Sequence, residues 1–197
     1  LHTAYRRQRQ MCIRDRLKLF LTNVVLETTD SDKHWYVVLT RTNSERKVRD
    51  YFQLQEVDTF LPVQNRVIER EGKRIERERL LLPRMVFVHI SRQEMAAVRS
   101  TLNVYDFLRD RSTGAPTCIP DAQMADFRYM LDYSQDQVIL TGESIPKGTR
   151  VVVAKGDLQG LRGELVRYNN KYHILVRIDM FGSAMVTIPA SYVRKEK

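Results

Sequence analysis

The sequence is poor in cysteine and has no long apolar run. Its two cysteines, Cys12 and Cys118, cannot build a disulfide framework, so we expect a reducing cytoplasm. No stretch approaches the roughly 18–20 apolar residues of a membrane-spanning helix. Residues 17–26 follow arginines, but Lys18, Asn23 and the lack of a small-residue cleavage site argue against a signal peptide. We therefore expect a cytoplasmic protein with no membrane segment, and we also expect it to be a monomer.

Motifs for metal binding and catalysis are also missing. The four histidines are scattered, and the sequence contains no H-E-x-x-H or Cys-x-x-Cys pattern. The glycines within residues 156–163 are not followed by the Gly-Lys-Ser/Thr of a phosphate-binding loop. No candidate nucleophile has a convincing base. These absences predict a protein that is not an enzyme and that needs neither a cofactor nor a metal.

The net charge of +9 is unevenly distributed along the chain. Residues 35–146 carry 16 basic and 16 acidic side chains, whereas residues 147–197 carry 10 basic and four acidic ones. A basic C-terminal part is typical of proteins that bind RNA or ribosome surfaces. A solvated basic face without a ligand explains the charge equally well, so both interpretations stay open.

The first part of the chain is expected to be a leader followed by an α+β domain. Residues 1–32 begin with a basic run that has no apolar periodicity, and we expect a disordered or artefactual leader without a role. From Trp35 onward, runs of β-branched and aromatic residues alternate with helical spacing. Four strands are predicted, at Trp35–Thr40, Thr59–Val63, Arg84–Ile90 and Val104–Arg109.

Helix starts are predicted by two capping boxes, Thr42-x-x-Glu45 and Ser91-x-x-Glu94. Met95, Val98 and Leu102 would form one face of the second helix. The resulting order, βαββαβ, is the ferredoxin-like arrangement. A third helix should start near Pro120-Asp121, with Met124, Phe127 and Leu131 at helical spacing.

A charged hairpin and a second domain complete the predicted organisation. Residues 64–79 mix basic and acidic side chains around a turn at Glu71-Gly72-Lys73, which predicts an exposed hairpin inserted into the first domain. We expect domain boundaries at 33–132 and 147–197, with a polar linker at 133–146. Five short strands favour a small SH3-like barrel in the C-terminal domain; they are expected at Arg150–Ala154, Glu164–Arg167, Tyr172–Ile178, Met185–Ile188 and Tyr192–Arg194.

The strand Arg84–Ile90 is the most informative local pattern. Its alternation places Val86, Val88 and Ile90 on one face and Met85, Phe87 and His89 on the other. The β-branched face suits the covered core of the sheet. The second face is either an open binding surface or is covered by the hairpin or the third helix.

The order and wording of these segments resemble the NusG family across nearly all of Trp35–Lys197. WYVVLTRTNSERKV at Trp35–Val48, FLPV at Phe60–Val63 and LLPRMVFV at Leu81–Val88 resemble the N-terminal domain, with Arg84 and Met85 where Gly and Tyr are usual. GDLQGLRGELV at Gly156–Val166 is similar to the KOW motif. IDMFGSAMVTI at Ile178–Ile188 resembles the final hairpin of that domain, with Ser183 in place of the usual Arg.

This resemblance implies a transcription elongation or antitermination factor. Its N-terminal domain would bind the clamp helices of the RNA polymerase β′ subunit, span the cleft toward β, and modulate pausing or termination. The residues implied for polymerase are Trp35, Tyr36, Pro83, Met85 and Phe87, and those for the non-template DNA strand are Arg41, Asn43, Arg46 and Lys47.

The C-terminal KOW domain would recruit the termination factor Rho or the ribosome through the protein also called NusE. Phe181 and Gly182 are the implied partner-binding residues, with barrel core as the other interpretation of Phe181. The departures from the usual motifs favour a specialised paralogue similar to UpxY or RfaH antiterminators. The alternative function is a ribosome-associated KOW protein that binds RNA.

Overall fold

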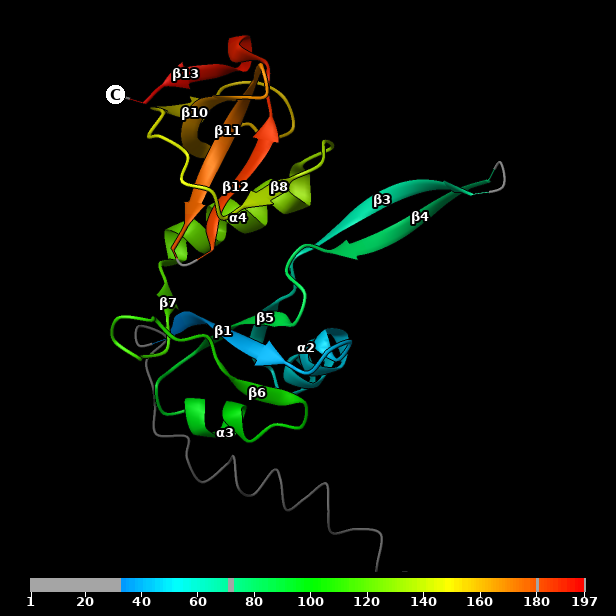
Figure 1. Ribbon diagram of the computed structural model, residues 1–197, viewed down its shortest axis with the longest axis vertical. Helices are drawn as coiled ribbons and strands as arrows, with labels where there is room; N and C mark the ends of the chain where they lie inside the picture. Colours follow the sequence, from blue (N-terminus) through cyan, green and yellow to red (C-terminus); the bar gives the residue numbers. More distant parts are fainter. Residues whose placement is uncertain (1–32, 71–72, 180, 197) are drawn as a thin grey trace, which may run out of the picture. The chain divides into compact units, whose positions relative to one another are not determined.

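The structure is a computed structural model, and it describes residues 33–70, 73–179 and 181–196 (Figure 1). The predicted leader at residues 1–32 and the centre of the predicted turn at residues 71–72 lie outside the described residues. From His34 onward the chain clusters into one compact unit. Among the described residues, no helix has the length and apolar character needed to cross a membrane. The fold is mixed, with many strands and few helices.

The N-terminal sheet has the antiparallel strand order β2-β5-β1-β6. Its strands are β1 (His34–Thr40), β2 (Asp58–Phe60), β5 (Met85–Ile90) and β6 (Val104–Phe107), and the short β7 (Cys118–Ile119) also pairs with β1. All four predicted strands are present. The second one is shorter than expected, because Leu61 and Pro62 separate β2 from the hairpin.

Two helices, α2 (Glu45–Leu54) and α3 (Met95–Arg99), contribute to the core on one face of this sheet. Val86, Val88 and Ile90 of β5 are buried in the same cluster as Val48 and Phe52 of α2. The predicted inward direction of the β-branched residues is therefore confirmed. The expectation for Leu102 is wrong: α3 ends at Arg99, and Leu102 is 81% exposed.

The helix starts differ from the predicted capping boxes. Ser44, not Thr42, is the N-cap of α2, and no side chain caps the helix. The buried carboxylate of Glu45 instead accepts a hydrogen bond from the backbone N–H of Arg84 at 2.8 Å, across a turn in which Arg84 has a φ of 65°. Before α3, the Glu94 carboxylate accepts bonds from the Ser91 N–H (2.7 Å) and hydroxyl (2.9 Å). One arm of the second capping box therefore forms, whereas the first box does not.

The predicted hairpin and third helix follow their sequence patterns. Strands β3 (Val63–Arg70) and β4 (Lys73–Leu80) form a two-stranded sheet of their own (Figure 1). Helix α4 (Asp121–Tyr133) buries Met124, Phe127 and Leu131, as the helical spacing predicts.

The C-terminal sheet has the order β13-β9-β10-β11-β12-β8. All five predicted strands are present within one or a few residues, and a sixth, β8, lies inside residues 133–146, where a linker is expected. The strands are β8 (Ile139–Thr141), β9 (Thr149–Val153), β10 (Arg162–Tyr168), β11 (Lys171–Ile178), β12 (Gly182–Thr187) and β13 (Val193–Lys195), with a 3-10 turn at Ala190–Tyr192.

An ion pair holds the segment before β9 onto this sheet. Both Nε and Nη2 of Arg177 donate to the Glu164 carboxylate at 2.8 Å, and Nη2 also donates to the Ile145 carbonyl at 3.1 Å. The same carboxylate accepts the Gly148 N–H at 2.8 Å. The hydrogen bonds from Arg177 lower the pKa of Glu164 against the opposing effect of burial. One carboxylate thus links two strands and the incoming chain.

Candidate functional site

An aromatic surface lies on the N-terminal sheet opposite α2 and α3. We call it the aromatic face and define it by Trp35, Phe60 and Phe87. Strand register places the three together, because Phe60 pairs with Phe87, and Trp35 pairs with His89, two residues beyond Phe87. The Trp35 and His89 rings stack with centroids 5.0 Å apart, and those of Phe60 and Phe87 lie 6.0 Å apart. Alternation along β1 and β5 thus gathers aromatic side chains on one side of the sheet.

Side chains from α4 and from the loop before β12 cover the aromatic face. The Phe127 ring lies 5.8 Å from that of Phe60 and 6.1 Å from that of Phe87. The Arg128 guanidinium sits 5.4 Å from the Trp35 ring centroid, in cation–π geometry. Phe181 completes the cover at 5.6 Å from Phe87. Phe87 is therefore fully buried, and the expectation of an open sheet face is wrong, whereas the alternative that the third helix covers it is confirmed.

Polar contacts reinforce the packing of α4 against the C-terminal sheet. Gln123 forms two hydrogen bonds with Asp179: its Nε2 donates to the carboxylate at 3.1 Å, and its Oε1 accepts the Asp179 N–H at 3.0 Å. The Tyr129 hydroxyl donates to the Gln159 carbonyl at 2.8 Å. These groups lie at the exposed margin of an apolar contact. They therefore fix how α4 is oriented on the sheet, and most of the stability comes from the apolar packing.

The residues predicted to bind polymerase fall into three environments. Trp35 and Phe87 are buried in the aromatic face, and Met85 is half-buried against the same cluster. Tyr36 lies on the opposite side of β1, in the core under α2, with its ring 6.1 Å from that of Phe107 in edge geometry. Pro83 is exposed. Only part of the predicted set therefore shares one surface.

The residues predicted to touch DNA lie together where β1 leads into α2. Arg41, Asn43, Arg46 and Lys47 are all exposed. Arg46 is engaged, because its Nη2 lies 2.7 Å from the Glu78 carboxylate of the hairpin.

The two residues predicted to bind a C-terminal partner lie at the start of β12. Phe181 is half-buried against Phe87 rather than free. Gly182 has a φ of 91°, and a Cβ at this position would meet the Thr141 carbonyl oxygen of β8. Close approach of two strands thus requires glycine at residue 182. Phe181 therefore contacts a residue predicted to bind polymerase, a pairing that the sequence patterns did not reveal.

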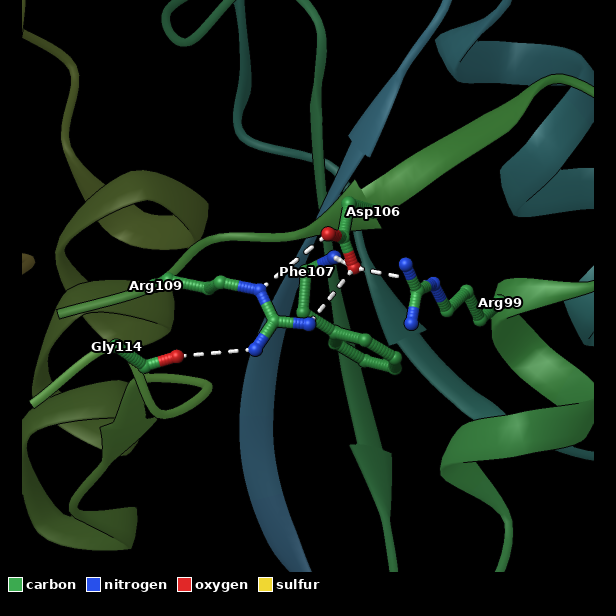
Figure 2. Close-up of polar contacts among 5 residues, drawn as sticks. All are labelled: Arg99, Asp106, Phe107, Arg109 and Gly114. Carbon is green, nitrogen blue, oxygen red and sulfur yellow. Dashed lines mark hydrogen bonds and ion pairs between the residues drawn. The ribbon is translucent and has the colours of Figure 1, made fainter.

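The sequence analysis also missed the polar cluster around Asp106 (Figure 2). Its carboxylate accepts the Phe107 N–H at 2.8 Å and lies 3.4 Å from Arg99 Nε and 3.3 Å from Arg109 Nε. Arg109 also donates to the Gly114 carbonyl at 2.9 Å. Burial raises the pKa of Asp106, but the bonds from Phe107 and Arg109 and the nearby arginine charges outweigh it, so the pKa is lowered. This cluster links β6 to α3, through Arg99, and to the loop that follows β6, through Arg109.

Metal-ligand geometry is not found in the part of the chain that the structure describes, where no three His, Cys, Asp or Glu side chains gather as candidate ligands. The one cysteine in that part, Cys118, is free, and burial raises the pKa of its thiol. The aromatic face and its cover are the candidate site, because they gather aromatic side chains from both sheets and α4.

The chain is similar to known proteins in its N-terminal half by sequence, and it aligns with solved structures over most of its length. The family model for NusG, described as transcription termination factor nusG, matches residues 33–128. No curated protein matches the sequence significantly. A solved structure on domain interaction in Thermotoga maritima NusG aligns with 20% identity over 85% of this chain and 99% of that chain, at a TM-score of 0.47. A structure of the MjSpt4:Spt5 complex aligns with 14% identity over 83% and 98%, at a TM-score of 0.27.

Proposed function

The chain belongs to the NusG family of transcription factors, and we propose that it is an elongation factor that binds RNA polymerase through its aromatic face. The partner surface would be the clamp helices of the β′ subunit, with the domain reaching toward β. Apolar helix-binding surfaces in proteins use flat aromatic rings and flexible methionines. Trp35, Met85 and Phe87 supply these groups, and Pro83 extends the surface to the exposed turn before β5.

The burial of Phe87 beneath Phe181 carries this proposal. Large exposed apolar patches are rare on soluble monomers and mark interaction sites or aggregation liabilities. A cover that can leave would keep such a face out of water while the partner is absent. Here part of the cover comes from the C-terminal sheet, through one ring and the hydrogen bonds between Gln123 and Asp179. We propose that departure of Phe181 removes the C-terminal sheet's part of this cover over Phe87, beside Met85, and makes that part of the face available to polymerase.

The exposed residues at the β1–α2 junction would contact the non-template DNA strand. Arg41, Arg46 and Lys47 offer cations to phosphates, and the Asn43 amide offers hydrogen bonds to bases or phosphates. In this proposal Arg46 exchanges its ion pair with Glu78 for a phosphate.

The C-terminal sheet would act as the recruiting module. We propose that residues 147–197 are a KOW domain with an SH3-like barrel, joined through 133–146 to a ferredoxin-like domain at 33–132. Phe181 and Gly182 would then dock Rho or the ribosomal protein also called NusE once the ring has left Phe87. The protein would be cytoplasmic, non-enzymatic and a specialised paralogue similar to UpxY or RfaH factors.

Retention of the full chain by purified, immobilised RNA polymerase tests the proposal. Met85→Asp places a charge at the half-buried margin of the aromatic face, and Leu54→Asp places the same charge on α2, where Leu54 is 80% exposed. We expect Met85→Asp to weaken retention at least tenfold, because burying a carboxylate in an apolar contact costs more than about 1.4 kcal/mol. Leu54→Asp should bind like the wild type.

Both variants are first compared with the wild type by circular dichroism and thermal unfolding. Equal weakening by the two substitutions would remove the aromatic face from the proposal. Failure of polymerase to retain either the wild type or a Phe181→Ala variant would reject polymerase binding altogether. Cosedimentation with ribosomes would then be measured, because a ribosome-associated RNA-binding protein is the remaining candidate.

A further inference from the structure

The charges of the β3–β4 hairpin are sorted by strand register. Residues paired across an antiparallel ribbon share one face, and successive residues alternate between faces. One face, here called the basic face, holds every hairpin-strand cation except Arg74 and no acidic residue. The other, the acidic face, holds all the strand carboxylates. The basic-face pairs are Gln64–Arg79, Arg66–Arg77, Ile68–Ile75 and Arg70–Lys73, and the acidic-face pairs are Val63–Leu80, Asn65–Glu78, Val67–Glu76 and Glu69–Arg74.

The described side chains of the two faces differ in their contacts within the fold. Glu78 accepts hydrogen bonds from Arg46 Nε at 3.1 Å and Nη2 at 2.7 Å. On the basic face, Gln64 at the base of the hairpin bonds with the backbone of residues 136 and 138. Arg77 and Arg79 are exposed and form no hydrogen bond or ion pair with any residue that the structure describes. Contacts with the described part of the chain therefore do not explain these two cations.

Two cross-strand pairs of the basic face place like charges opposite each other. Arg66 pairs with Arg77, and Arg70 pairs with Lys73. Such pairs destabilise a ribbon relative to neutral or opposite-charge pairs. The register places Glu69 and Glu76 on the other face, so neither offsets this repulsion as a cross-strand partner. A bound polyanion would offset it instead.

We propose that the basic face of the β3–β4 hairpin binds the phosphate backbone of duplex DNA. Arginine predominates over lysine on this face, and its planar fork suits phosphate oxygens. Same-face residues on a strand repeat about every 6.8 Å, which is about twice the 3.4 Å axial spacing of phosphates on one DNA strand. The pair Ile68–Ile75 places an apolar step between the two cationic pairs.

The shape of the hairpin favours DNA over RNA. A two-stranded ribbon fits the major groove of B-DNA, which is about 12 Å wide. The major groove of an RNA duplex is too deep and narrow for such entry. The acidic face would point away from the phosphates, so only one side of the ribbon can bind. This inference concerns DNA alone and does not depend on polymerase binding.

Fluorescence anisotropy of the full chain with a labelled DNA duplex of about 24 base pairs tests the inference. At about 3.4 Å per base pair, this duplex is longer than the eight-residue strands of the hairpin. Arg77→Gln removes a cation from the basic face, and Arg74→Gln removes one from the neighbouring acidic-face register of the same strand. Both variants therefore lose the same charge from the same exposed ribbon. Affinities are measured over a series of salt concentrations, with an RNA duplex of the same sequence and a polyglutamate peptide as further probes.

We expect Arg77→Gln to weaken DNA binding about fivefold to tenfold and to lower the slope of log affinity against log salt by about 0.9. Arg74→Gln should stay within about twofold of the wild type, because its position faces away from the phosphates. Equal losses in the two variants, or no DNA binding by the wild type at low salt, overturn the assignment. Tighter binding of the RNA duplex, or displacement of DNA by polyglutamate at matched charge, also overturns it in favour of RNA or an acidic protein surface.

Discussion

Removal of the Phe181 ring should strengthen polymerase binding. The ring lies 5.6 Å from Phe87 and forms the C-terminal sheet's aromatic contribution to the cover. Phe181→Ala deletes it while leaving Gly182 and the start of β12 in place. Under the proposed function, the variant populates the uncovered state more than the wild type does.

The size of the effect follows from the burial of the ring. Truncating a fully buried phenylalanine costs about 3–5 kcal/mol, and Phe181 is half-buried, so the contact contributes about 2 kcal/mol. Since 1.4 kcal/mol is tenfold in an equilibrium, the ratio of covered to uncovered protein falls by about thirtyfold. Apparent affinity scales with the competent fraction, so the dissociation constant for polymerase should fall by up to about thirtyfold.

Titration of labelled full-length chain with RNA polymerase measures this constant. Tyr172→Ala is the matched control, because Tyr172 is an aromatic residue of β11 that is 45% exposed and makes no ring contact with the aromatic face. It should bind polymerase like the wild type. Folded Phe181→Ala protein that binds no more tightly than Tyr172→Ala would refute the reasoning, because the ring would then not limit access to Phe87.

Three further substitutions test local features. Glu164→Gln should lower the free energy of unfolding by about 2 kcal/mol at neutral pH, by weakening the charged bonds from Arg177. Because Arg177 lowers the pKa of Glu164, that stabilisation is full above the unfolded-state pKa and is lost as the pH falls through the folded-state pKa. Urea titrations should therefore separate wild type and variant at neutral pH and bring their unfolding free energies together at acid pH. Arg84→Gly should raise the melting temperature, since a φ of 65° costs a side-chain-bearing residue about 1 kcal/mol; an unchanged or lower value would contradict this. Gly182→Ala should destabilise the chain more than Gly160→Ala, because both have positive φ but only residue 182 lacks room for a Cβ; equal losses in thermal unfolding would show that crowding is unimportant.

Strand positions could be predicted because alternation records which side of a strand is buried. Val86, Val88 and Ile90 face the helices as their spacing predicts. The same pattern also separates Phe87 from that core. It carries no information about what lies over Phe87, since that depends on contacts with Phe127 and Phe181, which are far away in the sequence.

Capping patterns were less reliable than alternation. Glu45 has the correct spacing for a capping box with Thr42, but its carboxylate bonds to the Arg84 N–H from another turn. A tertiary contact thus replaced a local one. Arg84 itself occupies the place where the resembling family usually has glycine, and its φ of 65° gives the physical reason for that preference.

The composition of the hairpin hid its organisation. Arginine and glutamate alternate irregularly along β4, so the sequence predicts only a soluble, charged segment. Antiparallel pairing brings Arg66 opposite Arg77 and places Glu76 on the other face. Alternation along β4 already separates Arg77 and Arg79 from its glutamates, but which β3 residues share a face with them depends on the register, which neither strand shows alone.

The contact between Phe87 and Phe181 makes each predicted docking residue the cover of the other. Under the proposed function, polymerase and the C-terminal partner both bind only the uncovered state. Their affinities are then thermodynamically linked, and each ligand must strengthen the other by the same factor. A chain already seated on polymerase would capture its second partner more tightly than the free chain does. One shared contact between the two docking residues thus makes assembly cooperative without a direct contact between the ligands.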